Sequence, residues 1–427
     1  MVIFMNRLFH FKENQTTLKQ ELLAGLTSYF TIAYILIINP AILADAGIPY
    51  AYALAATILA TAAGCFMIGG WGNAPMILTP GMGINAFFTY TIVQGFGLTW
   101  QQGLAAVIAA GLLFFIATIT PLAGIMVRAV PDSLKIGITV GVGIFLTFIG
   151  LQKGQLITAD TETFVTMGAI SSPQALLTIL GLLITMGLFV RKVKGSFLIG
   201  IVLTTGVAFL FGLTNPPQAD SIQFTGYTQM LGASDFSGVY QLSFWTAVFS
   251  LMIILMFESM GLLNGMLPDK KKFPKSYQAS AASAFTSGLF GTSPTIPTVE
   301  SASGIAEGGR TGLTAITVGV LFLASAFFAP MFTVIPDGAV APVLIIVGGL
   351  MVQEIRHIRF QEMSEWLPAY LIIGLIPLTY SIADGIAFGF IAYPLLKLAL
   401  GEPRSVSPIM YVISSLFFLH YVLMMVI

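Results

Sequence analysis

The stretch "LTPGMGINAFFTYTIV", from Leu78 to Val93, is apolar enough to cross a membrane, but it does not begin as a helix should. Pro80, Gly81 and Gly83 interrupt the helical pattern, and the amide of Asn85 follows among apolar neighbours. Inside a bilayer, unpaired backbone N–H and C=O groups are tolerated only where protein or a water-filled cavity satisfies them. The stretch therefore predicts a broken membrane span that lines a polar cavity.

The composition predicts the same class of protein. Hydrophobic residues make up 56% of the 427 residues and charged residues only 8%, which is typical of a polytopic α-helical membrane protein. Lys plus Arg equal Asp plus Glu at 18 each, so nothing indicates binding to nucleic acid. The single cysteine, Cys65, excludes an internal disulfide framework and a cysteine metal site, and we expect no metal or cofactor.

Apolar segments separated by short connectors predict about fourteen transmembrane segments. A further apolar stretch, 408–427, either spans the membrane or lies along its surface. The fourteen predicted segments lie near 20–45, 50–72, 74–97, 101–127, 131–151, 174–190, 196–213, 242–267, 274–290, 293–310, 311–335, 339–353, 364–382 and 384–400.

The positive charges predict the orientation. Lys and Arg residues collect in alternate connectors, from Arg7 through Arg128 to the run "DKKKFPK" at 269–275, which places the N-terminus in the cytoplasm of a cell. Of the 18 Lys and Arg residues, only Lys153 falls in a connector predicted to be external. The predicted external connectors carry acids instead, namely Asp160, Glu162, Asp220 and Asp235. We therefore expect a multi-pass protein of the cell membrane.

The two halves of the chain are predicted to enter the membrane in opposite directions. A long external loop, 214–241, separates two sets of seven segments, and seven is odd. The third segment carries "TPGMGIN" (79–85), and the tenth, which is third in its own half, carries "GTSPTIPTVES" (291–301). Matching Gly/Pro interruptions in corresponding segments are typical of inverted-repeat transporters, whose binding site lies between the repeats.

Three polar side chains are predicted to share the depth of these breaks. Counting about 1.5 Å per residue from the segment ends places Asn85, Glu258 and Glu300 near the middle of the membrane. An acid at that depth costs about 2.5–3.5 kcal/mol, so two of them indicate function rather than packing. Asn85 either binds a solute or caps its half-helix.

Two other pairs of residues leave simpler interpretations. Glu307 and Arg310, three residues apart, are expected to form a local ion pair at a segment end. Phe87 and Phe88 either stack on a flat ligand or pack in the core.

Several of these stretches together resemble the AzgA-like branch of the nucleobase–cation symporters, the hypoxanthine, guanine and adenine permeases. The resemblance covers nearly the whole chain. It rests on "LTSYFTIAYILIINPAIL" (26–43), "TPGMGINAFF" (79–88), "FLTFIGLQ" (145–152), "GTSPTIPTVESASGIAEGGRTG" (291–312), "APVLIIVGGLMV" (341–352) and "PLTYSIADGIAFGF" (377–390).

The resemblance implies fourteen spans in two inverted repeats, sorted into a core domain and a gate domain. It also implies proton-driven uptake of a purine, and related transporters are often homodimers through the gate domain. The implied divisions are an N-terminal part (1–19), the core domain (20–127 and 242–335), the gate domain (128–213 and 336–403), the external loop (214–241) and a C-terminal hydrophobic segment (404–427).

The resemblance also implies the site. By motif match, Gly83 and Asn85 correspond to the family's third-span site, Glu258 to the acid of its "FDTxG" and Glu300 to the acid of its "ES". Val299 and Ser301 flank Glu300 and complete the predicted set. Two positions depart from the family pattern, because Leu255 and Ser280 stand where acids are usual. These departures leave the choice of nucleobase and the proton stoichiometry open.

We expect a neutral purine to bind Glu258 while Glu300 organises the broken tenth span, and one of the two to carry the proton. The two roles are interchangeable at this stage. The alternatives are a symporter of xanthine, uracil or another small planar molecule, an anion carrier or channel, and a membrane-embedded enzyme. The two midplane acids and the absence of Lys or Arg at that depth disfavour the anion carrier. No nucleophile–base pair at that depth supports an enzyme.

Overall fold

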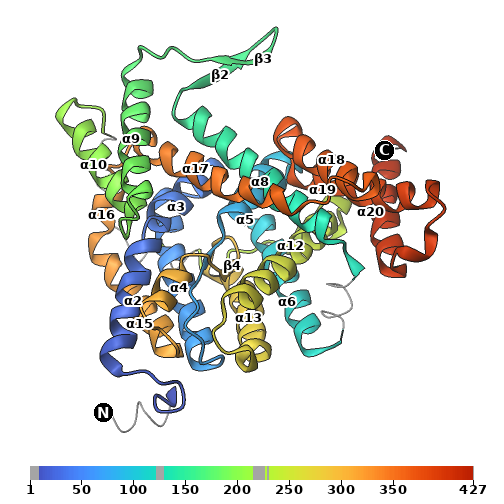
Figure 1. The fold of residues 1–427 in the computed structure, drawn as a ribbon. Helices are drawn as coiled ribbons and strands as arrows, with labels where there is room; N and C mark the ends of the chain where they lie inside the picture. The colour runs from blue at the N-terminus through green and yellow to red at the C-terminus, as the bar shows by residue number, and fades with distance from the viewer. Residues whose placement is uncertain (1–8, 122–128, 215–226, 228–229, 427) are drawn as a thin grey trace.

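The computed structural model describes residues 9–121, 129–214, 227 and 230–426. Arg7, Arg128, Asp220 and the last residues of the predicted segment 101–127 lie outside the described residues, as does much of the loop 214–241. Within the described part, the chain folds mostly into helices (Figure 1).

The predicted class, a polytopic helical membrane protein, is confirmed. Nine helical segments of the described residues are long and apolar enough to cross a membrane, and three apolar helices are shorter. The total of fourteen crossings stays a prediction. The nine are Leu18–Asp45, Tyr50–Gly70, Trp100–Ile119, Asp132–Lys153, Pro173–Val190, Leu242–Met266, Gly312–Phe332, Asp337–His357 and Ile382–Ala399; the three shorter ones are Ser196–Leu210, Met363–Thr379 and Pro408–Leu419.

The helices pack in two groups, each drawn from both halves of the chain. The first group consists of α2 (Leu18–Ile32), α3 (Ile35–Asp45), α4 (Tyr50–Gly70), α6 (Trp100–Ile119), α12 (Leu242–Met266), α13 (Phe273–Phe290) and α15 (Gly312–Ser325). The second group consists of α8 (Asp132–Lys153), α9 (Pro173–Val190), α10 (Ser196–Leu210), α17 (Asp337–Val352), α18 (Met363–Thr379), α19 (Ile382–Ala399) and α20 (Pro408–Val426).

The second group is held by close crossings of its helices. On α8 and α17, which are the corresponding segments of the two halves, Gly143 and Gly348 meet face to face. A Cβ on Gly143 would lie 2.7 Å from the carbonyl oxygen of Gly348, so only glycine allows this approach. The C-terminal helix α20 packs against α19, so the apolar stretch left undecided by the sequence is a helix attached to this group.

The third and tenth segments are broken, as predicted, but the breaks contain strands. The third consists of β1 (Leu78–Pro80), α5 (Met82–Ala86) and the π-helix η1 (Phe87–Gly95), and the tenth of β4 (Thr295–Pro297) and α14 (Ser301–Ala306). The strands pair antiparallel, with Thr79 opposite Ile296, and all six strand residues are buried. Each strand thereby satisfies backbone groups of the other where no water is at hand. This pairing was not predicted.

Two further features differ from the prediction. The first segment, predicted as continuous over 20–45, is interrupted at Ala33 and Tyr34 between α2 and α3. After α8, the strands β2 (Ile157–Asp160) and β3 (Phe164–Met167) form a hairpin that extends beyond the helices (Figure 1). The remaining short elements are η2 (Phe236–Tyr240), η3 (Lys270–Lys272), η4 (Ala326–Phe328), α16 (Ala329–Phe332), η5 (Gln353–His357) and η6 (Pro403–Ser405).

Candidate functional site

The strand pair lies inside the first helix group and gives the candidate site its frame (Figure 1). Helix α4 packs against both strands, and α12 and α13 pack against β4. The predicted site residues come from the segments that continue these strands and from α12. The positions of these residues are therefore described relative to the paired strands β1 and β4.

Asn85 is fully buried and connects the two broken segments. Its Oδ1 accepts a hydrogen bond from the Oγ–H of Ser293, 2.5 Å away, just before β4. Its Nδ2 has no partner among the described residues. A buried donor without an acceptor costs about 1–3 kcal/mol, so the unpaired Nδ2 needs an explanation that the described protein groups do not supply. The capping interpretation is wrong, because Asn85 lies inside α5 and the N-cap of that helix, Gly81, has no side-chain cap bond. Contact of Nδ2 with a solute stays a prediction.

A buried hydrogen-bond network holds Ser293, the partner of Asn85, in place. The Nδ2 of Asn39 donates to the hydroxyl oxygens of Thr57 (2.7 Å) and Thr292 (3.0 Å), and its Oδ1 lies 3.3 Å from the Oγ of Ser293. These side chains join α3, α4 and the start of the tenth segment. All are fully buried, so the network holds the Asn85 amide in one orientation.

Glu300 stands at the start of α14, where it receives a hydrogen bond from an unpredicted residue. The hydroxyl of Tyr34 donates to its Oε1 at 2.5 Å. Tyr34 is only 1% exposed, and its ring packs edge-on against Phe197 of α10, with 5.2 Å between ring centroids. Tyr34 therefore contacts both the candidate site and the second helix group. The sequence carries no Gly or Pro at 33–34 that signals this interruption of the first segment.

The two residues that flank Glu300 have different roles. The Oγ of Ser301 is buried and accepts a hydrogen bond from the backbone N–H of Ile77 at 3.0 Å, which ties the tenth segment to the third. Val299 is 63% exposed, although it sits beside the fully buried strand pair. Val299 is thus exposed, whereas the hydroxyl of Ser301 is bonded within the protein, and contact of either residue with a solute stays a prediction.

Glu258 on α12 is partly buried, and its carboxyl group has no hydrogen-bond partner among the described residues. The ring of its neighbour Phe257 faces the Nζ of Lys135 on α8, 5.3 Å from the ring centroid. Because α12 packs against β4, the carboxyl lies on a helix that borders the strand pair and remains available to an external donor.

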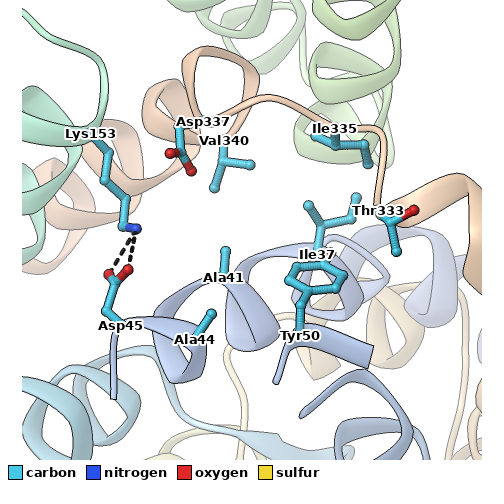
Figure 2. Close-up of a pocket in the computed structure, with 10 residues that line it drawn as sticks. All are labelled: Ile37, Ala41, Ala44, Asp45, Tyr50, Lys153, Thr333, Ile335, Asp337 and Val340. Atoms are coloured by element: carbon cyan, nitrogen blue, oxygen red, sulfur yellow. Dashed lines mark hydrogen bonds and ion pairs between the residues drawn. The ribbon is translucent and has the colours of Figure 1, made fainter. Parts of the chain in front are cut away.

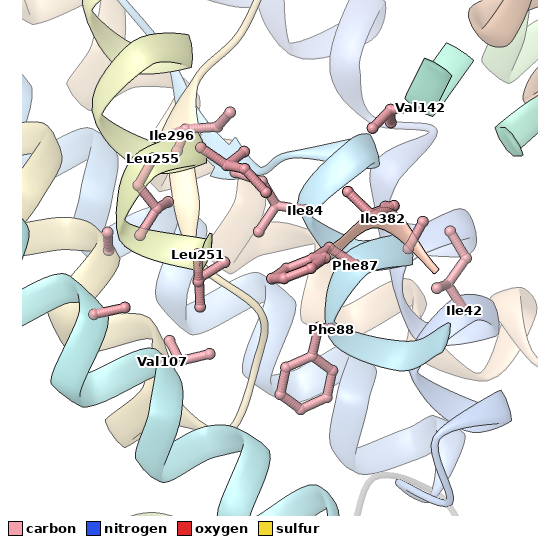
Figure 3. Close-up of a cluster of buried hydrophobic side chains, with 14 of the residues drawn as sticks. Ile42, Ile84, Phe87, Phe88, Val107, Val142, Leu251, Leu255, Ile296 and Ile382 are labelled. Carbon is pink, nitrogen blue, oxygen red and sulfur yellow. The ribbon is translucent and has the colours of Figure 1, made fainter. Parts of the chain in front are cut away.

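The two positions where the family pattern has an acid, Leu255 and Ser280, have structural contacts instead. Leu255 is fully buried in an apolar cluster that also contains Ile84 of α5 and Ile296 of β4 (Figure 3). Ser280 on α13 donates its hydroxyl to the Oγ of Ser259, 3.1 Å away. Each position therefore fixes α12 against its neighbours.

Phe87 and Phe88 belong to the same cluster as Leu255 (Figure 3). Both are 0% exposed, so the structure supports the packing interpretation for both rings. Gly83 faces the other helix group. A Cβ at this position would lie 2.7 Å from a methyl group of Val142 on α8. Gly83 is thus one point at which the broken third segment packs directly against the second group. Its place in the site stays a prediction.

The predicted residues lie around the strand pair without bonding to one another. Among the described residues, no hydrogen bond joins Asn85, Glu258 and Glu300. Asn85 is attached before the start of β4, through Ser293, and Glu300 follows its end. The arrangement leaves the Nδ2 of Asn85 and the carboxyl group of Glu258 without a hydrogen-bond partner among the described residues.

Two cavities of about 380 Å³ each lie elsewhere, near the end of α3. None of the predicted site residues lines either of them. Figure 2 shows the first, which is bordered by α3, by Lys153 of α8 and by Asp337 of α17. These cavities lie between the two helix groups.

The predicted ion pair between Glu307 and Arg310 is wrong. Glu307 instead contacts the Nζ of Lys194, from the connector between α9 and α10. The backbone N–H of Arg310 donates to the carboxylate of Glu21. The expected pairing assumed a continuous helix, in which residues three apart share a face, but α14 ends at Ala306 and Gly308 has a φ of +95°.

A family model described as the permease family matches residues 19–388. The chain belongs to this permease family. The permease is 46% identical to the nucleobase transporter PlAzg2 of Paenibacillus larvae, over 88% of this chain and 77% of that protein. It is 39% identical to the guanine/hypoxanthine permease PbuO of Bacillus subtilis (96% and 99% covered) and 35% identical to the adenine permease AdeP of Escherichia coli (98% and 96%). These relatives place the permease in the AzgA-like branch, so it is a multi-pass transporter and not an enzyme.

Solved structures share the fold of the permease at low identity. The transmembrane domain of a cyanobacterial bicarbonate transporter, BicA, superimposes with a TM-score of 0.65 at 17% identity, over 86% of this chain and 97% of that one. The murine anion transporter Slc26a9 gives 0.65 at 11% identity, over 90% and 69%. This likeness concerns the fold alone.

Proposed function

We propose that this permease imports a purine nucleobase, hypoxanthine/guanine or adenine, together with a proton across the cell membrane. The observation that carries the proposal is the carboxyl group of Glu258. It lies partly buried on a helix that packs against β4, and no described protein group bonds to it. The names of the relatives, which are nucleobase, guanine/hypoxanthine and adenine permeases, agree with a purine.

The free groups of the site suit the edge of a purine base. Such a base presents N–H donors and carbonyl or ring-nitrogen acceptors side by side. The Glu258 carboxylate accepts one or two N–H bonds, and the unpartnered Nδ2 of Asn85 donates to an acceptor. Glu300, held by Tyr34, fixes the start of α14 rather than binding the base directly.

Proton coupling follows from the same carboxyl groups. A neutral carboxyl group costs less in a membrane interior than a carboxylate does, so binding a proton with the neutral base removes the charge of the loaded site. The first helix group then acts as the core domain and moves the loaded site past the second group, the gate domain. Glu258 or Glu300 carries the proton, and two copies pair through the gate domain.

Two alternative cargoes rest on specific observations. A xanthine- or uracil-type solute is favoured by Leu255, which puts a buried apolar side chain where the family usually has an acid. An anion is suggested by the fold of BicA, but the candidate site here presents two acidic side chains and would repel it.

Uptake into proteoliposomes tests the proposal. Purified permease is reconstituted, and accumulation of radiolabelled hypoxanthine, guanine and adenine is measured with and without an inward proton gradient. We expect saturable accumulation that depends on the gradient and is inhibited by purines more strongly than by xanthine or uracil. Uptake indifferent to the gradient would refute proton coupling, and preferential inhibition by uracil would refute the purine assignment.

Replacing the proposed binding acid gives the residue-level test. Glu258→Gln removes the charge and the exchangeable proton at nearly constant shape, so we expect purine uptake to fall by about tenfold or more, since a hydrogen bond to a charged group contributes about 1.5–3 kcal/mol. The matched control is Glu354→Gln, because Glu354 pairs with His357 at an exposed position. Purine uptake with unchanged proton dependence in Glu258→Gln would show that this acid does not carry the coupling.

A further inference from the structure

An ion pair joins the two helix groups beside the cavities. The Nζ of Lys153, at the end of α8, lies 2.7 Å and 3.0 Å from the two carboxylate oxygens of Asp45, at the end of α3 (Figure 2). The side chains are only 15% and 31% exposed. Lys153 is also the one Lys or Arg that the charge pattern placed outside. The ion pair with Asp45 explains why a cation stands in a connector that is otherwise predicted to carry acids.

Asp45 is the centre of this contact. The hydroxyl of Tyr90, from the π-helix of the third segment, donates to its Oδ2 at 2.6 Å, and the side-chain amide of Gln94 donates to its backbone oxygen at 2.9 Å. The first helix group thus holds the carboxylate in place, and the second group supplies the cation. Lys153 is the group that leaves if the two helix groups separate here.

Aromatic rings close the same junction. Tyr380, between α18 and α19, packs edge-on against Tyr90 at 5.5 Å and against Phe145 of α8 at 4.9 Å, and its hydroxyl donates to the side-chain oxygen of Gln152. The contact between Tyr380 and Tyr90 again crosses from one group to the other. Asp45 and Lys153 line both cavities, so the ion pair lies on the boundary that the two cavities share.

Comparison with the opposite face shows a second such pair. Lys194, between α9 and α10, contacts Glu307 after α14, and this pair also joins the second group to the first. With the charge-based orientation, Asp45–Lys153 faces outward and Lys194–Glu307 faces the cytoplasm. A transporter that exposes one site alternately to two sides must separate its groups at one face while they stay in contact at the other.

We infer that the cavity of Figure 2 is the closed outer entrance of the solute path, and that the Asp45–Lys153 ion pair is the latch that keeps it closed. Opening the path to the outside separates Lys153 from Asp45 and Tyr380 from Tyr90. The inference rests on the alternating motion in the proposed function, but it is independent of which solute is carried.

Labelling of a cysteine in the cavity tests the latch without measuring transport. Ala41 lines the cavity on α3 and is partly buried, so Ala41→Cys introduces a small reporter. The natural Cys65 is 0% exposed and supplies the background. A membrane-impermeant maleimide is added to intact cells, where it reaches the outer face. It is added separately to inverted vesicles, where it reaches the cytoplasmic face.

In the Ala41→Cys protein, we expect Lys153→Met and Asp45→Asn each to raise the labelling rate in intact cells by about two- to fivefold, because a partly exposed ion pair stabilises one of two states only modestly. Lys153→Arg, which keeps the cation, should label at the parent rate. The double variant Lys153→Met/Asp45→Asn should label no faster than either single variant, because both remove one contact.

The matched control is Lys194→Met, which breaks the ion pair on the opposite face and should not raise labelling from outside. Equal labelling rates in the parent and in both single variants overturn the inference. So does a Lys194→Met rate as high as that of Lys153→Met, which indicates general loosening. Additive increases in the labelling rate of the double variant also overturn it. Labelling only in inverted vesicles overturns the outer assignment, because it places the entrance on the cytoplasmic face. If the labelling results are as expected but the protein transports no nucleobase, the proposed function is refuted and the inference about the ion pair stands.

Discussion

Tyr34 shows how a single hydroxyl group positions an acid of the candidate site. Its hydrogen bond occupies one oxygen of Glu300, while its ring contacts Phe197 in the other helix group. In the proposed function, the bond fixes the carboxyl at the start of α14 and affects the solute only through Glu300. Tyr34 is therefore a positioning residue.

Removing only the hydroxyl tests this role. In Tyr34→Phe the ring remains on Phe197, and we expect the KM for the transported base to rise about three- to tenfold, which corresponds to the ~0.5–1.5 kcal/mol that a typical hydrogen bond contributes. The maximal uptake rate should change less. Tyr29→Phe is the control, because it removes a comparable hydrogen bond to Ser325 outside the candidate site. A normal KM with a reduced amount of folded protein would indicate a purely structural role.

At the residue scale, the sequence identified the unusual side chains but not their partners. Glu258, Glu300 and Asn85 are conspicuous because polar groups at midplane depth are costly. Tyr34 is not conspicuous, since an aromatic residue in an apolar helix is ordinary. Likewise, the pairing of Glu307 with Lys194 joins residues 113 positions apart, for which sequence spacing gives no signal.

At the element scale, Gly83 allows the broken third segment to touch α8. An added methyl group would lie 2.7 Å from Val142, whose branched side chain has little freedom to move aside. We expect Gly83→Ala to lower the initial uptake rate at least about fivefold, since overpacking costs about 1–3 kcal/mol.

A compensating change separates crowding from other effects of Gly83→Ala. Val142→Ala removes the colliding methyl group, so the double variant should recover at least half of the lost uptake rate. Gly261→Ala on α12 is the neutral control, because a Cβ there meets no atom within 4 Å. No recovery in the double variant would show that Gly83 acts by direct contact with the solute.

The start of α15 depends on a carboxylate from α2. Glu21 is fully buried, and its oxygens accept hydrogen bonds from the backbone N–H groups of Arg310 (2.9 Å) and Thr311 (3.2 Å) and from the hydroxyl of Thr314 (2.6 Å). A carboxylate at a helix N-terminus is favoured by the unpaired N–H groups and the helix dipole.

We expect Glu21→Gln to lower the free energy of unfolding by about 1–2 kcal/mol, because it keeps the acceptor oxygen but loses the charge. Thermal unfolding of the purified protein in detergent measures this loss as a lower Tm. Glu13→Gln, at an exposed position near His10, should leave the Tm unchanged. An equal Tm for Glu21→Gln and the parent would contradict the capping role.

The sequence predicted where the third and tenth segments break but not what fills the breaks. Pro80, Gly81 and Pro297 mark the interruptions, because they disfavour helix. A strand of three residues has no measurable periodicity, and its pairing partner lies in the other half of the chain. The interruption at Ala33 and Tyr34 was missed because it contains neither Gly nor Pro.

At the scale of the whole molecule, the orientation is a prediction from charge alone and has a direct test. Glu162 in the hairpin and Lys271 between α12 and α13 are both exposed, and the natural Cys65 is buried. We expect Glu162→Cys to react with an impermeant maleimide in intact cells, and Lys271→Cys only in inverted vesicles. The reverse pattern would invert the proposed direction of the whole chain.

The inverted architecture was predictable because it follows from counting segments and comparing their interruptions. The grouping of helices was not predictable from composition or periodicity, because each group mixes helices of both halves through contacts such as Gly143 with Gly348. The implied core and gate divisions came from the resemblance and stay a proposal. Their relative movement is what the labelling of Ala41→Cys examines.

The antiparallel pairing of β1 with β4 has a consequence for biosynthesis. Pro80 leaves the ribosome 215 residues before its partner Thr295, and at about 5–20 residues per second this interval lasts about 10–40 s. During that time the first strand resides in the translocation machinery or the bilayer with one edge unsatisfied. The pairing of β1 is therefore possible only after Thr295 has been synthesised, and a chain that ended before this residue would keep an open backbone edge.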